Sequence, residues 1–193
     1  MTQLSFFGAD TAEPDVADLA GLLAGPGQAV TRGEAARVSV VVSDDWRVRA
    51  LTARFAALGL EAEQAETHGG AVVVRSAFSP VLLPLVRSWH RGGVKSAPDS
   101  LRLTAEALRW WCVAAGRGSA VGYLLRLGAN DERVWEPSGA ALAAAGVSGV
   151  VLSPRAGGPA YRVSGRRRLA RLGELVGQRP DGAPAFDWPE AES

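Results

Sequence analysis

The stretch Leu19-Ala20-Gly21-Leu22-Leu23-Ala24-Gly25-Pro26-Gly27 decides how this 193-residue chain folds. Apolar residues recur at helical spacing from Val16 to Leu23, and Asp15 stands where an N-capping side chain is expected. Gly25-Pro26-Gly27 then closes the helix, because proline cannot continue the helical hydrogen-bond ladder and glycine favours helix ends. We therefore predict a short, largely apolar helix that ends at Gly25.

On both sides of this helix, helical and strand-like patterns alternate along the chain. The first half continues with two strands within 29–43, a helix over 46–58 that Asp44-Asp45 can cap, strands over 61–67 and 71–78, and a helix over 79–89. The second half shows a helix over 104–113, a strand over 123–127, a helix over 136–145, strands over 150–153 and 160–164, and a helix over 166–176. Both halves share one order, which predicts an α+β fold of two pseudo-symmetric αββαββα halves.

Composition excludes several classes of protein. No apolar run approaches the roughly 18–20 residues that a membrane span needs, and the first ten residues do not resemble a signal peptide. The single cysteine, Cys112, excludes an internal disulfide and a multi-cysteine zinc site, and we expect it to be a buried core thiol. Two histidines are too few for a histidine-rich metal centre. We therefore expect a cytoplasmic protein without metal or cofactor.

The net charge of +1 hides an asymmetry along the chain. The segment after residue 179 holds four acids and no basic residue, so the remainder is clearly basic. All basic residues but Lys95 are arginines, whose planar guanidinium groups bind phosphates and guanine edges. A GC-rich genome would produce the same arginine bias. The composition thus permits nucleic-acid binding without requiring it.

The nine-residue stretch resembles the LAGLIDADG motif, which names a family of homing endonucleases. Its first four residues and its last match the motif. In that family two such helices pack at a pseudo-twofold axis, small residues permit their close approach, and an acid at the eighth position binds the divalent metal. Here the eighth position is Pro26, and the sixth, also acidic in the motif, is Ala24.

A second copy lies at residues 108–116, which read Leu-Arg-Trp-Trp-Cys-Val-Ala-Ala-Gly and resemble the variant L-x-x-W-(aromatic)-x-D-D-G. The two acids of that variant fall on Ala114 and Ala115. Upstream, residues 89–98 resemble the family segment W-Y-x-x-G-x-K-x-x-P, in which Lys95 stands where the family keeps a lysine near the scissile phosphate. The resemblance covers about residues 15–177. An unrelated α+β domain with an alanine-rich helix is the alternative.

The substitutions imply a protein without nuclease activity, because magnesium requires oxygen ligands and neither proline nor alanine has a side-chain oxygen. What the resemblance leaves is a saddle of strands that binds double-stranded DNA. Each candidate could instead be a solvated surface residue. The candidate DNA-binding residues are Arg32, Arg37, Arg75, Lys95, Arg126, Arg155, Arg162, Arg166 and Arg167.

Residues Gln3-Leu4-Ser5-Phe6-Phe7 resemble the pentapeptide Q-L-(S/D)-L-F, with which bacterial proteins bind the sliding clamp of DNA polymerase. The resemblance implies that Gln3 hydrogen-bonds at one end of the clamp groove, Leu4 fills one pocket, and Phe6 and Phe7 fill another. Alternatively, the two phenylalanines are buried against the chain's own domain.

These observations predict four segments: an arm over 1–14, LAGLIDADG-like halves over 15–100 and 101–177, and a disordered acidic tail over 178–193. The predicted function is that of a monomeric, non-catalytic DNA-binding protein of replication or repair, recruited by the sliding clamp to the nucleoid. One alternative is a transcriptional regulator similar to WhiA, a family of degenerate relatives that adds a helix-turn-helix, which we do not find in this sequence. Another is a protein–protein adaptor that does not bind DNA.

Overall fold

The central helix forms where its sequence predicts it. The computed structural model describes residues 13–190. A 3-10 turn, Val16–Leu19, leads directly into α1, Ala20–Ala24. Asp15 caps the turn, because its carboxylate accepts a hydrogen bond of 2.9 Å from the backbone N–H of Ala17. The helix ends at Gly25, as the Gly-Pro-Gly sequence predicts.

The two halves contain the same series of elements. In the first half α1 is followed by β1 (Gln28–Arg32), β2 (Ala35–Val42), α2 (Asp45–Ala57), β3 (Ala62–Glu66), β4 (Val72–Ser76) and α3 (Leu83–Ser88). A small hairpin of β5 (His90–Arg91) and β6 (Val94–Lys95) leads to the second half. That half consists of α4 (Ala105–Ala115), β7 (Gly116–Ser119), β8 (Gly122–Arg126), α5 (Glu132–Ala144), β9 (Val150–Leu152), β10 (Ala160–Val163) and α6 (Arg166–Val176).

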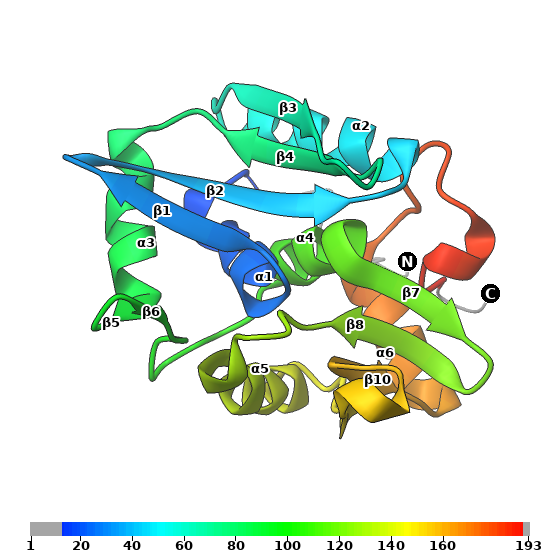
Figure 1. Ribbon diagram of the computed structural model, residues 1–193. Coiled ribbons are helices and arrows are strands. Elements are labelled where there is room, and N and C mark those ends of the chain that lie inside the picture. The colour runs from blue at the N-terminus through cyan, green and yellow to red at the C-terminus, as the bar shows by residue number, and fades with distance from the viewer. Residues whose placement is uncertain (1–12, 191–193) are drawn as a thin grey trace, which may run out of the picture.

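Each half builds a four-stranded antiparallel sheet with the same topology. The strand order is β1-β2-β4-β3 in the first sheet and β7-β8-β10-β9 in the second. Figure 1 shows the two sheets above and below α1 and α4, which lie together at the centre. The predicted α+β fold of two αββαββα halves is confirmed.

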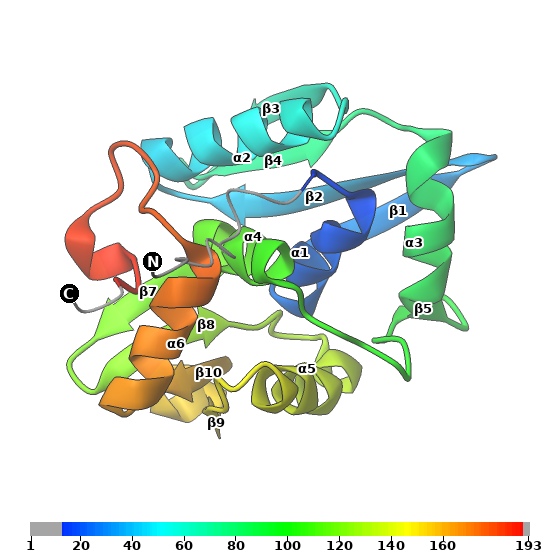
Figure 2. The same cartoon turned by 180° about the vertical axis from the view of Figure 1, so that it is seen from behind.

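The helices cover one side of both sheets. Figures 1 and 2 show strands toward the viewer from one side and α2, α4, α5 and α6 from the other. Strand β2 explains this layering, because Ala36, Val38, Val40 and Val42 are buried while the residues between them are not. An alternation of period two places the first set on the helix side and leaves the other face without a covering layer.

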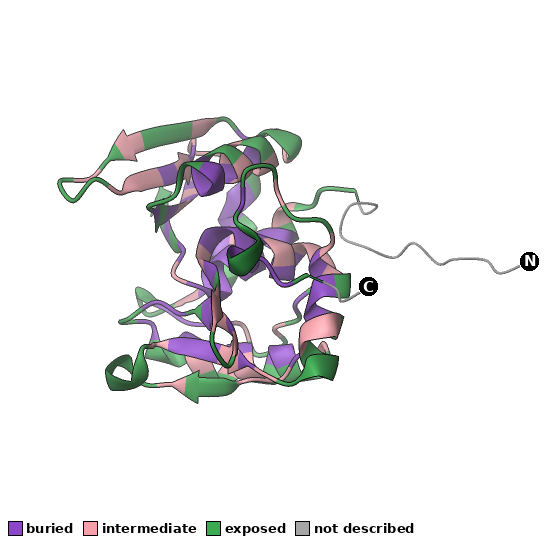
Figure 3. Ribbon diagram, turned by 90° about the vertical axis from the view of Figure 1, so that its right-hand side faces the viewer, coloured by how far each residue is buried: buried purple, intermediate pink, exposed green. Residues whose placement is uncertain are grey.

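The helices α1 and α4 meet backbone to backbone. A Cβ atom at Gly21 would collide with the backbone carbonyl of Ala107, so only glycine permits this approach. Thr104, the N-cap of α4, also donates a 2.6 Å hydrogen bond to the carboxylate of Asp18. Buried residues concentrate around this helix pair, and exposed ones at the periphery (Figure 3). The predicted close packing of the two motif helices is therefore confirmed.

The adjacent tryptophans of α4 point to different parts of the core. The ring of Trp110 packs edge-on against Phe55 of α2, with 5.0 Å between ring centroids. Trp111 donates a 2.7 Å hydrogen bond to the backbone carbonyl of Arg126 in β8. Between them and the second sheet, Cys112 is fully buried, and this burial raises the pKa of its thiol to about 12. The expected core thiol is confirmed.

Three elements differ from the sequence prediction. Strand β7 was not predicted, since Gly-Arg-Gly-Ser lacks β propensity; its pairing with β8 across a tight turn supplies the strand. The β5–β6 hairpin was also missed. Helix α5 begins at Glu132 and not at residue 136, and it contains Pro137.

The predicted disordered tail is wrong for residues 178–190. Trp188 is 3% exposed, and its indole N–H donates to the carbonyl of Gly177 over 3.0 Å. Tyr123 of β8 donates to the backbone carbonyl of Asp187 over 3.0 Å. One buried aromatic side chain thus anchors a segment whose composition alone favours disorder. None of the helices within residues 13–190 is both long and apolar enough to cross a membrane.

We expect Gly21→Leu to destabilise the fold by about 1–3 kcal/mol or more, because the new side chain would have to separate α1 from α4. Urea unfolding followed by circular dichroism measures this change. Ala53→Leu, on the exposed face of α2, is the matched control and should change stability by less than about 0.5 kcal/mol. Equal stability of the two variants would contradict the close helix contact.

Candidate nucleic-acid interface

The free face of the first sheet carries three of the predicted arginines. In the register of the sheet, Arg32 pairs with Ala35 and Arg75 pairs with Ser39. Paired residues of antiparallel strands share a face, so Arg32, Arg37 and Arg75 all lie opposite the buried residues of β2. The structure therefore brings these three side chains together on one face of the sheet.

These arginines are held in place by neighbouring side chains. Glu63 of β3 lies 2.8 Å from Nε of Arg75 and 4.0 Å from a terminal nitrogen of Arg37. The guanidinium groups of Arg32 and Arg37 lie over the ring of Phe78, at 4.0 and 4.5 Å from its centroid. The first sheet thus offers ordered guanidinium groups whose positive charge is partly neutralised by one carboxylate.

The free face of the second sheet carries Arg126 and Arg162, as predicted, together with Arg117. Arg162 pairs with Leu124, and Leu124 pairs with Arg117 on its other side, so both arginines share this face. Arg126 donates to the carbonyl of Gly157 over 3.3 Å. Arg117 lies 3.7 Å from the carboxylate of Asp187. Arg117 was not among the predicted residues, because the residues around it do not resemble a strand.

The two free faces together are called the saddle below. They also expose apolar side chains: Val30 is 50% exposed, and Val41 and Val150 are each 56% exposed. Valine methyl groups between arginines can contact base edges or a protein surface. The saddle is therefore a mixed surface and not a purely basic one.

The other predicted DNA-binding residues lie outside the saddle. Arg155 lies in the loop between β9 and β10. Arg166 and Arg167 begin α6, which belongs to the helix layer seen from behind in Figure 2. Lys95 is buried. The clamp-binding residues Gln3, Leu4, Ser5, Phe6 and Phe7 lie outside the described residues.

A pocket of about 330 Å³ lies where the C-terminal ends of α1 and α4 reach the saddle. Pro26 and Ala115, for which the motif resemblance expects acids, both line it, beside Arg117 and Arg126 of the second sheet. The carboxylate that lines it is that of Asp44, which accepts a 2.9 Å hydrogen bond from Nε of Arg47. The pocket thus joins basic side chains to the two helix ends.

A buried lysine caps the C-terminal end of α1. The ammonium group of Lys95 donates to the carbonyls of Gly25 and Gly27 over 3.1 and 2.6 Å. It also lies 2.7 Å from the carboxylate of Asp131, which in turn accepts a 2.9 Å hydrogen bond from Gln28. Burial lowers the pKa of Lys95, and Asp131 opposes that effect. The expected phosphate-facing lysine is instead satisfied inside the protein.

A buried arginine caps the C-terminal end of α4 in the same manner. Arg47 of α2 donates to the carbonyls of Cys112, Val113 and Gly116, over 3.1, 2.8 and 2.6 Å. Its remaining charge is balanced by Asp44 at 2.9 Å and Asp187 at 3.9 Å. Arg47 was not among the predicted residues, because nothing in residues 45–57 indicates that one arginine of the helix points into the core.

Both helix ends are therefore neutralised by protein cations. The C-terminal end of a helix carries a partial negative charge, which a cation stabilises. In this chain Lys95 and Arg47 supply that cation, and Pro26 and Ala115 offer no carboxylate. No cluster of three or more His, Cys, Asp or Glu that could hold a metal ion occurs within residues 13–190. The residues present at the helix ends do not fit a divalent metal.

Three comparisons with known proteins were made, and one of them found a match. No protein-family model matches the chain, and no curated protein matches it. The chain is similar to the homing endonuclease I-WcaI, whose structure was solved bound to its DNA recognition sequence. The TM-score is 0.60 over 86% of this chain and 83% of that chain, with 9% sequence identity. The fold is that of a single-chain LAGLIDADG homing endonuclease.

We expect Lys95→Met to destabilise the protein by about 3–5 kcal/mol, because it leaves the carboxylate of Asp131 buried without its partner. Chemical denaturation measures the loss, and adding Asp131→Asn should recover part of it. Arg91→Met, which removes an exposed pair with Asp99, is the control and should cost at most about 1 kcal/mol. If Lys95→Met were as stable as this control, the buried cap would be refuted.

Proposed function

We propose that this chain is a non-catalytic protein that binds double-stranded DNA on its saddle. The observation that carries the proposal is the convergence of six arginines on the free faces of two symmetry-related sheets. They are Arg32, Arg37, Arg75, Arg117, Arg126 and Arg162.

The chemistry of these residues supports DNA as the ligand. Guanidinium groups bind phosphates and read guanine edges, and a two-sheet surface presents them in rows. The similar endonuclease I-WcaI was solved with its DNA recognition sequence. Stacking on Phe78 holds Arg32 and Arg37 of the first sheet in defined positions, which favours binding because less side-chain entropy is lost.

The absence of catalysis is part of this proposal. Hydrolysis of a phosphodiester in such a fold needs carboxylates that hold metal ions against the phosphate. The motif resemblance assigns Pro26 and Ala115 to those positions, and Arg47 and Lys95 neutralise the adjacent helix ends. Restoring the acids would place them beside cations that already have partners.

Recruitment by the sliding clamp completes the proposal, and it places the protein in replication or repair. Its support is the sequence Gln3-Leu4-Ser5-Phe6-Phe7 alone. An interaction of micromolar strength is sufficient, because DNA binding by the same chain adds avidity.

A protein–protein adaptor is the second candidate, and the exposed valines of the saddle favour it. Salt-dependent affinity for DNA separates the two functions. A transcriptional regulator would in addition prefer one promoter sequence over random duplex. Selection from a random duplex library would reveal such a preference.

We expect duplex DNA to bind with an affinity that falls by about 0.9 log units per log unit of salt for each phosphate contacted. Arg126→Ala combined with Arg162→Ala should lower this slope by about 2, because two phosphate contacts are lost. Fluorescence anisotropy with a labelled duplex, at salt concentrations between about 50 and 200 mM, measures the affinity and its salt dependence.

A variant that is expected to strengthen DNA binding provides a second test. Glu63→Gln should strengthen binding by up to about fivefold, since it releases Arg37 and Arg75 from an exposed ion pair. Glu66→Gln removes the same charge from the same strand but on the helix side, and should leave the affinity nearly unchanged. No binding at low salt would exclude the DNA proposal and favour the adaptor.

We expect no cleavage of plasmid or duplex DNA by the purified chain in magnesium or manganese. Agarose gels over a time course measure this, with a mock purification from cells that do not express the chain as a control for contaminating nuclease. Cleavage that follows the protein through purification and is lost when Pro26 or Ala115 is replaced by a bulky residue would overturn the non-catalytic assignment.

We expect a peptide of residues 1–10 to bind purified sliding clamp with a Kd near micromolar, about −8 kcal/mol. The peptide with Phe6→Ala and Phe7→Ala should bind far more weakly, because burial of each ring contributes about 1.5–3 kcal/mol. Isothermal titration compares the two. Equal binding by both peptides, or none by either, would remove the recruitment claim.

A further inference from the structure

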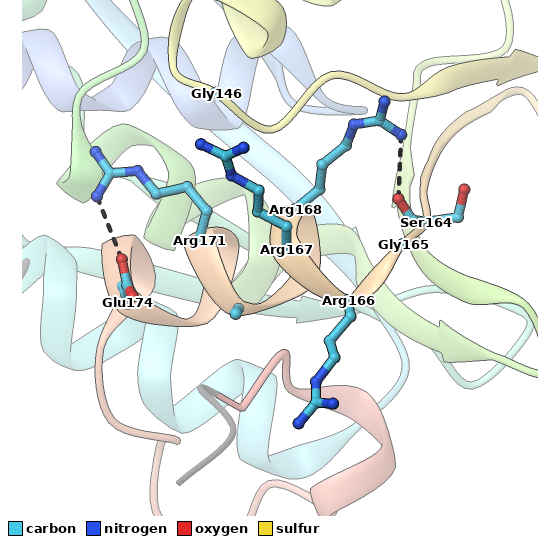
Figure 4. A pocket seen from close by; sticks show the side chains of 9 residues that line it. Gly146, Ser164, Gly165, Arg166, Arg167, Arg168, Arg171 and Glu174 are labelled. Carbon is cyan, nitrogen blue, oxygen red and sulfur yellow. Dashed lines mark hydrogen bonds and ion pairs between the residues drawn. The ribbon is translucent and has the colours of Figure 1, made fainter.

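A second basic surface lies on the helix layer, at the start of α6. Arg167, Arg168 and Arg171 line a pocket of about 810 Å³ there, together with Ser164, Gly165 and Gly146. Figure 4 shows these three guanidinium groups on the same side of α6. All three arginines are exposed, so their charged groups are available to a ligand from solvent.

The charges around this pocket are unbalanced. Helix α6 has no acidic residue in its first turn, and its N-cap, Gly165, makes no side-chain capping hydrogen bond. The N-terminal end of a helix carries partial positive charge, so the arginines add to it and do not offset it. Glu174 is the carboxylate that lines the pocket, at its far end and 3.4 Å from Arg171. An anionic ligand would relieve this excess of positive charge.

The spacing of the arginines suits a chain of anions better than a single one. Residues 167 and 168 are four and three positions before 171, so the Cβ atom of each lies about 5–6 Å from that of Arg171 on the helix surface. Arg168 also donates to the carbonyl of Ser164 over 3.3 Å, which orients its side chain along the pocket. Successive phosphates of a nucleic-acid strand present negative charges along a line of this kind.

This pocket is remote from the saddle. Helix α6 packs against α4 and covers the helix side of the second sheet. In Figure 1 the saddle faces the viewer and α6 lies behind the strands. Figure 2 shows the molecule from the opposite side, with α6 in front. A duplex on the saddle is therefore separated from the pocket by the sheet and by the helix layer.

We propose that Arg167, Arg168 and Arg171 bind the phosphate backbone of a second nucleic-acid segment, so that one chain can hold two segments at once. The proposal rests on the saddle as the first binding surface. The shared chemistry is the phosphate group, which free nucleotides also carry.

A capture experiment tests this proposal. A biotinylated duplex on beads retains the protein, and a second, fluorescent duplex is then added. The wild-type chain should capture the second duplex. Arg167→Gln, Arg168→Gln and Arg171→Gln together should retain the first duplex and reduce capture at least tenfold. Glu174→Gln should increase capture, because it releases Arg171.

A charge-matched control replaces Arg87, Arg102 and Arg133, all exposed and outside both surfaces, with glutamine, and should capture normally. For three phosphate contacts, capture by the wild type should weaken about 40-fold between about 50 and 200 mM salt. Capture that is equal in the α6 triple variant, or lost equally in the control, would overturn the proposal.

Two further arms separate the possible failures. If the wild type does not retain the first duplex, the proposed function fails. The pocket is then judged by binding of the fluorescent duplex to protein immobilised through its C-terminus. Binding lost in the α6 variant supports the site, and unchanged or absent binding overturns it. Titration with inorganic pyrophosphate and ATP identifies the phosphate source. Tight binding of either, without duplex capture, would overturn the nucleic-acid assignment.

Discussion

The contact between the backbones of α1 and α4 organises the rest of the structure. Gly21 of α1 lies against the carbonyl of Ala107 of α4 with no room for a side chain, so these two helices meet backbone to backbone between the two halves. Helix α1 leads into β1 of the first sheet, and α4 leads into β7 of the second. The distance between the two helices therefore helps to set the distance between the two sheets. The saddle exists as one surface because this approach is so close.

A close pair of helices brings two C-terminal ends to the same region, and their partial negative charges need compensation. In this protein the compensation comes from within, since Lys95 caps α1 and Arg47 caps α4. Each buried cation is itself balanced by an aspartate, Asp131 or Asp44. The two helix ends and their buried cations thus form polar contacts inside an otherwise apolar core.

The two halves share topology but differ in how their arginines are balanced. On the first sheet a single carboxylate, Glu63, contacts two arginines, and Phe78 underlies two. On the second sheet Arg126 contacts a backbone carbonyl, and Arg117 contacts Asp187 of the C-terminal segment. The C-terminal segment thus links the saddle to the core through Trp188, although its composition resembles that of a disordered tail.

Local patterns determined the order of most elements and the positions of the two central helices. Such features depend on neighbours in the chain: Asp15 caps the turn before α1, and the alternation in β2 marks its buried face. Tertiary structure alone decided which charges are buried. Lys95, Arg47 and Asp131 look like surface residues in the sequence, yet they are buried because helix ends distant in the chain need partners. Strand β7 likewise forms only because β8 pairs with it, and Arg117 reaches the saddle for that reason. Periodicity reports one element at a time, whereas burial of a charge depends on what the folded chain places beside it.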